Sequence, residues 1–223
     1  MKLFGGYIER PGSMKGMFLF ANCSKLVDNA LIEECLPDLR KYFAVNYAVT
    51  NCVFSGIEAA ATDMRTMKAG AVVFIVDEKT LPSVLFSPEE NWGLVNARSV
   101  ARGFAGEVNE AFRERMKREI YRAFMMTAGG TTSQFPMNIM TSHTIADIDA
   151  PSRAFMPVDM IQRIMDYLPR IGITPVAKVT YATACKEGWA PKPQNEHQQR
   201  IWDKVHQLPA TPMKIEFDPK KGK

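Results

Sequence analysis

The sequence predicts an α/β protein in which a mixed sheet packs against helices. Strand-like and helix-like patterns alternate through its first half, the run Ala71–Val76 is continuously apolar, and a long amphipathic pattern covers Glu107–Met126. An unbroken apolar run rich in β-branched residues is typical of a central strand, because its side chains point to both faces of the sheet. Alternation of strands with helices builds layered α/β folds.

The elements before the central run follow from periodicity and capping. Apolar residues at helical spacing predict one helix, begun by Asp28 or Asn29 and interrupted by Pro37, and Ser55 is a candidate cap for a second. Alternating apolar residues predict the strands. The predicted strands are Leu3–Ile8, Lys15–Cys23 and Val45–Val53, and the predicted helices are Ala30–Phe43 and Ser55–Met67.

The second half contains fewer regular patterns. The helix Glu107–Met126 carries an apolar stripe and ends at Gly129-Gly130, which we interpret as a helix C-cap and not as a phosphate-binding loop. We expect loop structure over Leu81–Trp92 and irregular structure over Thr131–Ile148. Further elements are predicted as a short or edge strand at Trp92–Asn96, a helix at Pro157–Tyr167, a strand at Ile173–Tyr181 and a helix at Glu196–Leu208.

Length and composition indicate one globular domain. The chain has 223 residues, of which 46% are hydrophobic and 23% charged, and we expect a single domain over residues 1–208 followed by a basic tail over 209–223. A net charge of +4 does not indicate nucleic-acid binding. No apolar run is long enough to span a bilayer, and the four scattered cysteines form no CxxC pair, so we expect reduced thiols and a cytoplasmic protein.

The sequence contains no complete metal-binding or nucleophile motif. The three histidines are His143, His197 and His206, and the last two lie nine residues apart on opposite faces of one predicted helix. Neither HxxxH nor GxSxG spacing occurs, so we expect no metal and no cofactor. Asp147 and Asp149 fit a turn better than a cation site.

The order of elements, set beside the long helix, resembles that of the metzincin metallopeptidases, and most closely the archaemetzincins. The segment Arg118-Glu119-Ile120-Tyr121-Arg122 stands where HExxH falls in that family. Asn138-Ile139-Met140-Thr141-Ser142 resembles the methionine turn beneath the zinc, and Ile145–Asp149 resembles the segment that follows it. The resemblance implies a zincin-like fold over about Lys15–Leu168.

The same resemblance implies a degenerate zinc site. Arg118 and Arg122 stand in place of two histidine ligands, and Met125 and Ala128 in place of the glycine and the third ligand. A guanidinium does not lose its proton near neutral pH and does not bind zinc. Only Glu119 remains of the catalytic set, and a general base without metal-bound water has nothing evident to activate.

We therefore expect a non-catalytic metzincin-like protein that acts in binding or as a structural subunit. Arg118, Glu119, Arg122 and His143 are the candidate ligand-binding residues, for a small anionic ligand or a protein partner. A charged helix face exposed to water is the competing interpretation of the arginines and Glu119, and the sequence favours it. The alternative function is an enzyme with an unrecognised site, either a metallopeptidase or a hydrolase that uses Cys185.

Overall fold

The computed structural model of the chain describes residues 7–104, 108–134, 138–141 and 158–207. They divide into two compact units, a larger one over Gly12–Val176 and a smaller one formed by Met1–Pro11 together with Ala177–Lys223. The sequence predicts a single domain over residues 1–208. It indicates no border between Pro11 and Gly12 or between Val176 and Ala177, because the composition does not change there. The predicted basic tail, 209–223, lies outside the described residues.

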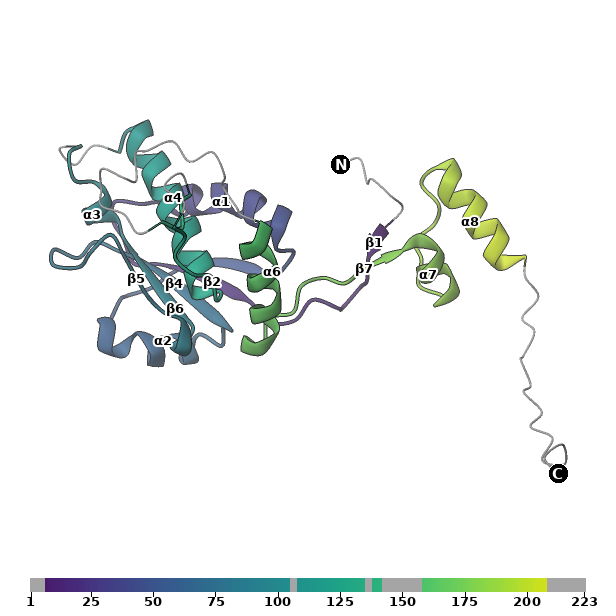
Figure 1. Ribbon diagram of the computed structural model, residues 1–223, viewed down its shortest axis with the longest axis horizontal. Helices are drawn as coiled ribbons and strands as arrows, with labels where there is room; N and C mark the ends of the chain where they lie inside the picture. The colour runs from purple at the N-terminus through teal and green to yellow at the C-terminus, as the bar shows by residue number, and fades with distance from the viewer. Residues whose placement is uncertain (1–6, 105–107, 135–137, 142–157, 208–223) are drawn as a thin grey trace, which may run out of the picture. The chain divides into compact units, whose positions relative to one another are not determined.

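A five-stranded mixed sheet forms the centre of the larger unit (Figure 1). Its order is β3-β2-β4-β6-β5, in which β5 alone is antiparallel to its neighbour. β4 lies in the middle and is buried at all six positions, as its apolar run predicts. The strands are β2 (Phe18–Asn22), β3 (Tyr47–Asn51), β4 (Ala71–Val76), β5 (Val84–Ser87) and β6 (Trp92–Asn96).

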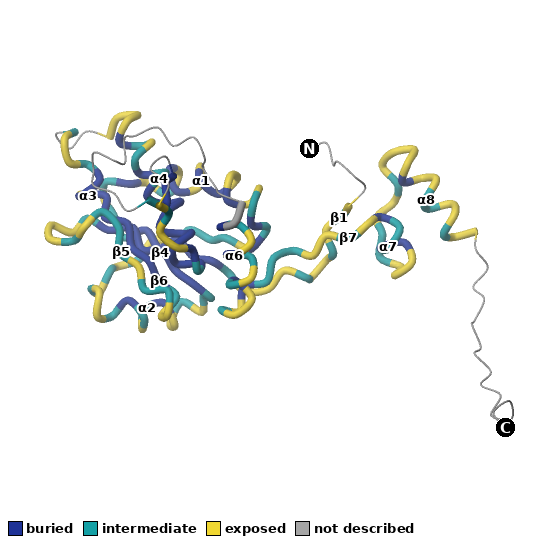
Figure 2. Tube along the Cα trace, viewed as in Figure 1, coloured by how far each residue is buried: buried dark blue, intermediate teal, exposed yellow. Residues whose placement is uncertain are grey.

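Helices cover both faces of this sheet, so the central strands appear dark blue in the burial view (Figure 2). Alternate residues of β2 and β4 enter two separate apolar cores. Phe18 and Val73 belong to the core beneath α1 (Asn29–Tyr42), α4 (Glu110–Thr127) and α6 (Val158–Tyr167). Leu19 and Phe74 belong to the core beneath α2 (Ala60–Thr66). This arrangement explains why β4 has no polar side: both of its faces are covered.

The helix α4 crosses the sheet and is the longest described helix. Asn109 begins it by accepting a hydrogen bond from the Phe112 N–H at 3.0 Å. Its first half is amphipathic, whereas every residue from Glu119 to Thr127 is buried. The helix predicted over about Glu107–Met126 is confirmed, although it begins at Glu110 and ends at Thr127. None of the described helices has both the length and the apolarity to cross a bilayer.

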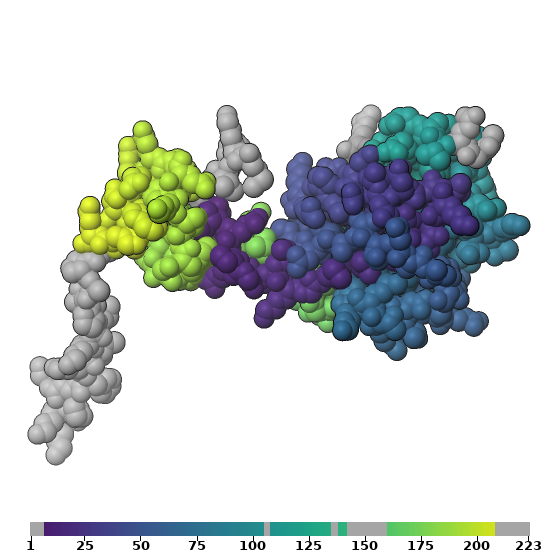
Figure 3. Space-filling model, turned by 180° about the vertical axis from the view of Figure 1, so that it is seen from behind, coloured from purple at the N-terminus to yellow at the C-terminus, as the bar shows by residue number. Residues whose placement is uncertain are grey.

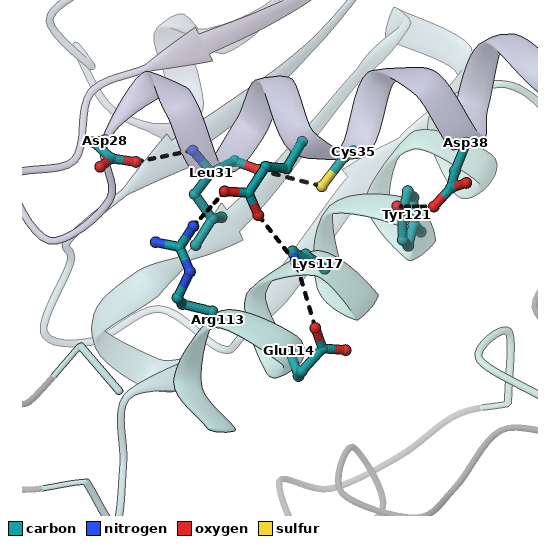
Figure 4. A network of polar contacts seen from close by, with 9 residues as sticks. Asp28, Leu31, Cys35, Asp38, Arg113, Glu114, Lys117 and Tyr121 are labelled. Atoms are coloured by element: carbon teal, nitrogen blue, oxygen red, sulfur yellow. Dashed lines mark hydrogen bonds and ion pairs between the residues drawn. The ribbon is translucent and has the colours of Figure 1, made fainter. Parts of the chain in front are cut away.

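A polar network joins α1 to α4 on their outer surface (Figure 4). Glu34 of α1 pairs with Arg113 at 2.5 Å and with Lys117 at 3.1 Å. One turn further along α4, the Tyr121 hydroxyl donates to the Asp38 carboxylate at 3.0 Å. Asp28 caps α1 by accepting from the Leu31 N–H, which confirms one of the two predicted caps. These contacts fix the rotation of α4 about its axis.

Four sequence expectations are corrected. The predicted loop Leu81–Trp92 contains strand β5, which is half-buried at the sheet edge and lacks a clear alternation. The second helix begins with a 3-10 turn at Ile57–Ala59, and Ser55 does not cap it. A further short helix follows β6, namely α3 (Ala97–Val100). The strand predicted over Ile173–Tyr181 is reduced to β7 (Lys178–Thr180), because Thr180 caps the helix α7 (Tyr181–Lys186).

The smaller unit consists of a two-stranded sheet and two helices. β1 (Tyr7–Glu9) pairs antiparallel with β7, and Arg10 forms an ion pair with Glu187 at 2.6 Å. The helix α8 (Glu196–His206), which is capped by Asn195, packs on α7. In the space-filling view the unit is formed by the purple start and the yellow-green end of the chain (Figure 3). Segments from both ends of the chain therefore build it.

Gly93 of β6 permits the close approach of α4 to the sheet. A Cβ at this position would lie 2.2 Å from Thr127 Oγ1, whereas its other neighbours would lie at 3.4 Å or more. We expect Gly93→Ala to lower the free energy of unfolding by about 2 kcal/mol, because the buried Thr127 side chain must move to relieve the clash. Urea unfolding of Gly93→Ala, of Thr127→Ala and of the double variant measures these free energies. We expect the double variant to recover about 1 kcal/mol relative to the sum of the single changes, and strict additivity would contradict the assignment.

The ion pairs of Glu34 make stability depend on pH. The hydrogen bond from Lys117 and the charge of Arg113 lower the pKa of Glu34 below its ordinary value. A depressed pKa adds stability above the pKa of the unfolded state, about 4.3, which is lost as the pH falls through the folded value. The urea midpoints of the wild type and Glu34→Gln should differ at pH 7 and converge by about pH 3. The neighbouring exposed Glu33→Gln is the matched control, and an equal pH effect there would contradict the assignment.

Candidate functional site

Helix α4 carries three of the four predicted site residues, and two of them, Glu119 and Arg122, lie in its buried half. Arg118 and Arg122 lie one turn apart and share a face, as residues at i and i+4 do. Arg118 is half-buried, Arg122 is 8% exposed and Glu119 is fully buried. The interpretation of these residues as a charged face exposed to water is therefore wrong for Glu119 and Arg122. Their burial cannot be predicted from the number of charged residues in the segment, because it depends on the buried apolar residues around them.

The charges of Glu119 and Arg122 act on each other inside the protein. Burial lowers the pKa of the Arg122 guanidinium, and the negative charge of Glu119 opposes this effect by raising it. A guanidinium keeps its proton under such conditions, so the two side chains neutralise each other in the interior. Removal of one partner from a buried pair leaves an uncompensated charge, which costs about 3–5 kcal/mol. Glu119 thus favours the charged form of Arg122 in the interior.

The positions where the family places its glycine and third ligand contain apolar side chains. Met125 and Ala128 are both fully buried. The helix then ends as predicted, with Gly129 at a φ of +84° and the Gly130 N–H donating to the Met125 carbonyl at 2.8 Å. This part of α4 offers no side chain that binds a metal ion.

The predicted methionine turn is present in the described residues 138–141. Asn138 Oδ1 accepts from the Met140 N–H at 2.9 Å, and the Asn138 carbonyl accepts from the Thr141 N–H at 3.0 Å. The Met140 side chain is fully buried, and its methyl group would lie 3.1 Å from a Cβ at Gly130. A tight turn thus places a methionine beneath the end of α4.

The histidines are not brought to this helix within the described residues. His143 lies outside them, as do Asp147 and Asp149. His197 and His206 are exposed on α8, in the other unit. His206 stacks on Trp202 with ring centroids 4.1 Å apart, and its Nδ1 lies 2.8 Å from the Trp202 carbonyl. Across the part of the chain that the structure describes, no three His, Cys, Asp or Glu side chains gather as a metal-binding group.

Cys185, the alternative nucleophile, lies on α7 and is 5% exposed. Burial raises its pKa, against a smaller opposite effect of the Tyr181 hydroxyl. The thiolate is the nucleophilic form of cysteine, and a raised pKa makes it scarce near neutral pH. The environment of Cys185 is that of a structural cysteine.

A groove of about 800 Å³ adjoins the end of α4. Gly129, Gly130 and Thr131 form one side of it, and Arg163 and Tyr167 of α6 contribute to the other. Arg163 Nε donates to the Gly129 carbonyl at 2.9 Å. Sequence reasoning missed this groove, because α6 and the end of α4 are separated by about thirty residues and no motif joins them.

Comparison with solved structures shows which known fold the chain resembles. No protein-family model and no curated protein matches the sequence. Among solved structures, the archaemetzincin of Methanopyrus kandleri matches with a TM-score of 0.54 and 12% identity, over 72% of this chain and 99% of that one. A zinc-dependent peptidase from Methanocorpusculum labreanum matches with a TM-score of 0.52 and 12% identity, over 67% of this chain and 100% of that one. The chain therefore has an archaemetzincin-like α/β fold, as its element order predicts.

Proposed function

We propose that this chain is a non-catalytic metzincin-like protein that acts in binding or as a structural subunit. The proposal rests on the residues of α4. By the resemblance, arginines occupy two of the ligand positions, and in the structure Glu119 is fully buried and its charge acts on Arg122. A general base must reach the water that it activates. Glu119 instead compensates a buried guanidinium.

Electrostatics also opposes a zinc ion at this place. Two unit charges about 4 Å apart repel by roughly 4 kcal/mol at an intermediate effective dielectric, and a divalent ion doubles that figure. Arg118 and Arg122 would both stand beside the ion and repel it, and Glu119 would offset part of their charge. Such a site disfavours the cation and favours an anion.

The anionic ligand and the protein partner remain two candidate occupants. Arg118 is the more exposed of the two arginines, so it is the one that we expect to meet a bound carboxylate or phosphate. Arg122 already has Glu119 as an electrostatic partner in the interior. The difference supports a role in binding for Arg118 and a role in folding for Arg122.

The second candidate function is an enzyme. A metallopeptidase would require ligands from His143, Asp147 and Asp149, which lie outside the described residues. A cysteine-dependent hydrolase would require Cys185, and its burial and raised pKa oppose this role. The metallopeptidase alternative is supported by the similarity of the fold to those of an archaemetzincin and a zinc-dependent peptidase.

Zinc titration separates the two functions. We expect the metal-stripped protein to bind zinc weakly or not at all in isothermal titration calorimetry, and to cleave no member of a peptide library, because its guanidiniums do not act as ligands. Submicromolar one-to-one binding together with chelator-sensitive cleavage would contradict the non-catalytic proposal.

The matched control restores histidines to the helix. The double variant Arg118→His/Arg122→His reads His-Glu-Ile-Tyr-His over 118–122, which places two imidazoles on one face of α4. We expect this variant to bind zinc at least tenfold more tightly than the wild type in the same titration. Equal, weak binding by both proteins, with the variant folded by circular dichroism, would show that this face does not hold the two residues as the fold implies.

A further inference from the structure

Two cysteines meet at the carboxyl ends of the neighbouring parallel strands β2 and β3. Cys23 and Cys52 each follow the last residue of a strand, and those last residues, Asn22 and Asn51, are direct partners in the parallel pair β2–β3. The Cys52 N–H donates to the Asn22 carbonyl at 3.0 Å, and the Cys23 N–H donates to the Ile75 carbonyl at 2.8 Å. The ladder of the sheet thus fixes both backbones.

The two sulfur atoms are almost at bonding distance. Cys23 Sγ and Cys52 Sγ lie 2.7 Å apart. A disulfide bond measures about 2.05 Å and joins Cα atoms about 4.4–6.8 Å apart. Neighbouring strands are spaced at about 4.8 Å, so residues in register across them satisfy the second requirement. A movement of roughly 0.7 Å between the sulfurs closes the bond without a rearrangement of the strands.

The pair is also accessible. Cys23 and Cys52 are half-buried and line a groove of about 640 Å³ at this end of the sheet. The other two cysteines, Cys35 and Cys185, are buried. Cys35 Sγ lies 3.6 Å from the Leu31 carbonyl, which accepts its hydrogen bond. A small oxidant in water therefore meets the Cys23–Cys52 pair before it meets the remaining thiols.

We propose that Cys23 and Cys52 are a thiol modification site, which forms a reversible disulfide on reaction with a low-molecular-weight disulfide such as glutathione disulfide. The sequence does not reveal this pair, because its members lie 29 residues apart and belong to no CxxC motif. The bond would tie β3, at the edge of the sheet, to β2.

The reaction proceeds by two thiol–disulfide exchanges. The Cys52 thiolate, which accepts a hydrogen bond from the Cys23 thiol, attacks one sulfur of glutathione disulfide. That S–S bond breaks, a mixed disulfide forms on Cys52, and one glutathione thiolate leaves. The Cys23 thiolate then attacks Cys52 Sγ and displaces the second glutathione. Two electrons pass to the reagent, and the two protons of the protein thiols end on the two glutathione molecules.

The environment of the pair sets the pH dependence of this reaction. Burial raises the pKa of both thiols, and the negative charge of Asp63 adds to the effect. Since the thiolate is the attacking species, the exchange should be slow at pH 7 and become faster as the pH rises to 9. A free cysteine, with a pKa of about 8.5, levels off within that range.

The test treats the folded, fully reduced protein with glutathione disulfide and then counts thiols after denaturation and alkylation. We expect the number to fall from four to two. Peptide mapping should show a Cys23–Cys52 cross-link, a mass lower by about 2 Da and no attached glutathione, all reversed by dithiothreitol. Four remaining thiols, a lasting glutathione adduct, or a bond through Cys35 or Cys185 would each overturn the proposal.

Variants separate the pair from the other thiols. Cys23→Ser should keep one glutathione on Cys52, because the second exchange lacks its nucleophile, and Cys52→Ser provides the same test if the first variant does not fold. Cys185→Ala, in the other unit, is the matched control and should form the same cross-link as the wild type. Formation of an intramolecular disulfide in Cys23→Ser would overturn the assignment.

Discussion

The burial of a charged segment of α4 against the sheet is the constraint on which the larger unit depends. Gly93 allows the helix to approach β6, and the contacts of Glu34 and Asp38 with α4 fix its rotation. Once the helix is fixed in this way, Glu119 and Arg122 must enter the interior. A charged side chain is costly to bury without an opposite charge, and Glu119 supplies one for Arg122.

Under the proposed non-catalytic function, this constraint would explain how an archaemetzincin-like fold persists without a metal ion. In a metallopeptidase the corresponding helix face would present neutral imidazoles to a cation. Here the same face holds two cations and one anion, and most of it is covered. Packing, helix capping and the buried Met140 provide order that does not depend on a bound metal. The fold and the chemistry of its site are therefore separable in this chain.

Sequence reasoning predicts the parts of the fold that local patterns determine. The run Ala71–Val76 identifies the central strand, and Asp28 identifies a helix start, because burial on two faces and capping leave direct traces in the sequence. Strand β5 escapes prediction since its position depends on pairing with β6 and not on its own pattern. The burial of Glu119 is not predicted either, because it depends on how closely α4 approaches the sheet. The proximity of Cys23 and Cys52 depends on strand register, which the sequence does not display.

The central claim is that Glu119 and Arg122 form a structural charge pair in place of a metal site. A double-mutant cycle with Glu119→Gln, Arg122→Met and the combined variant, followed by urea unfolding at pH 7, tests it most directly. We predict that each single change lowers the free energy of unfolding by about 3 kcal/mol or more, because it removes an opposite charge from beside a buried one. The double variant should then be more stable than additivity allows by about 2 kcal/mol. Single changes that cost little, with effects that add within about 0.5 kcal/mol, would contradict the account.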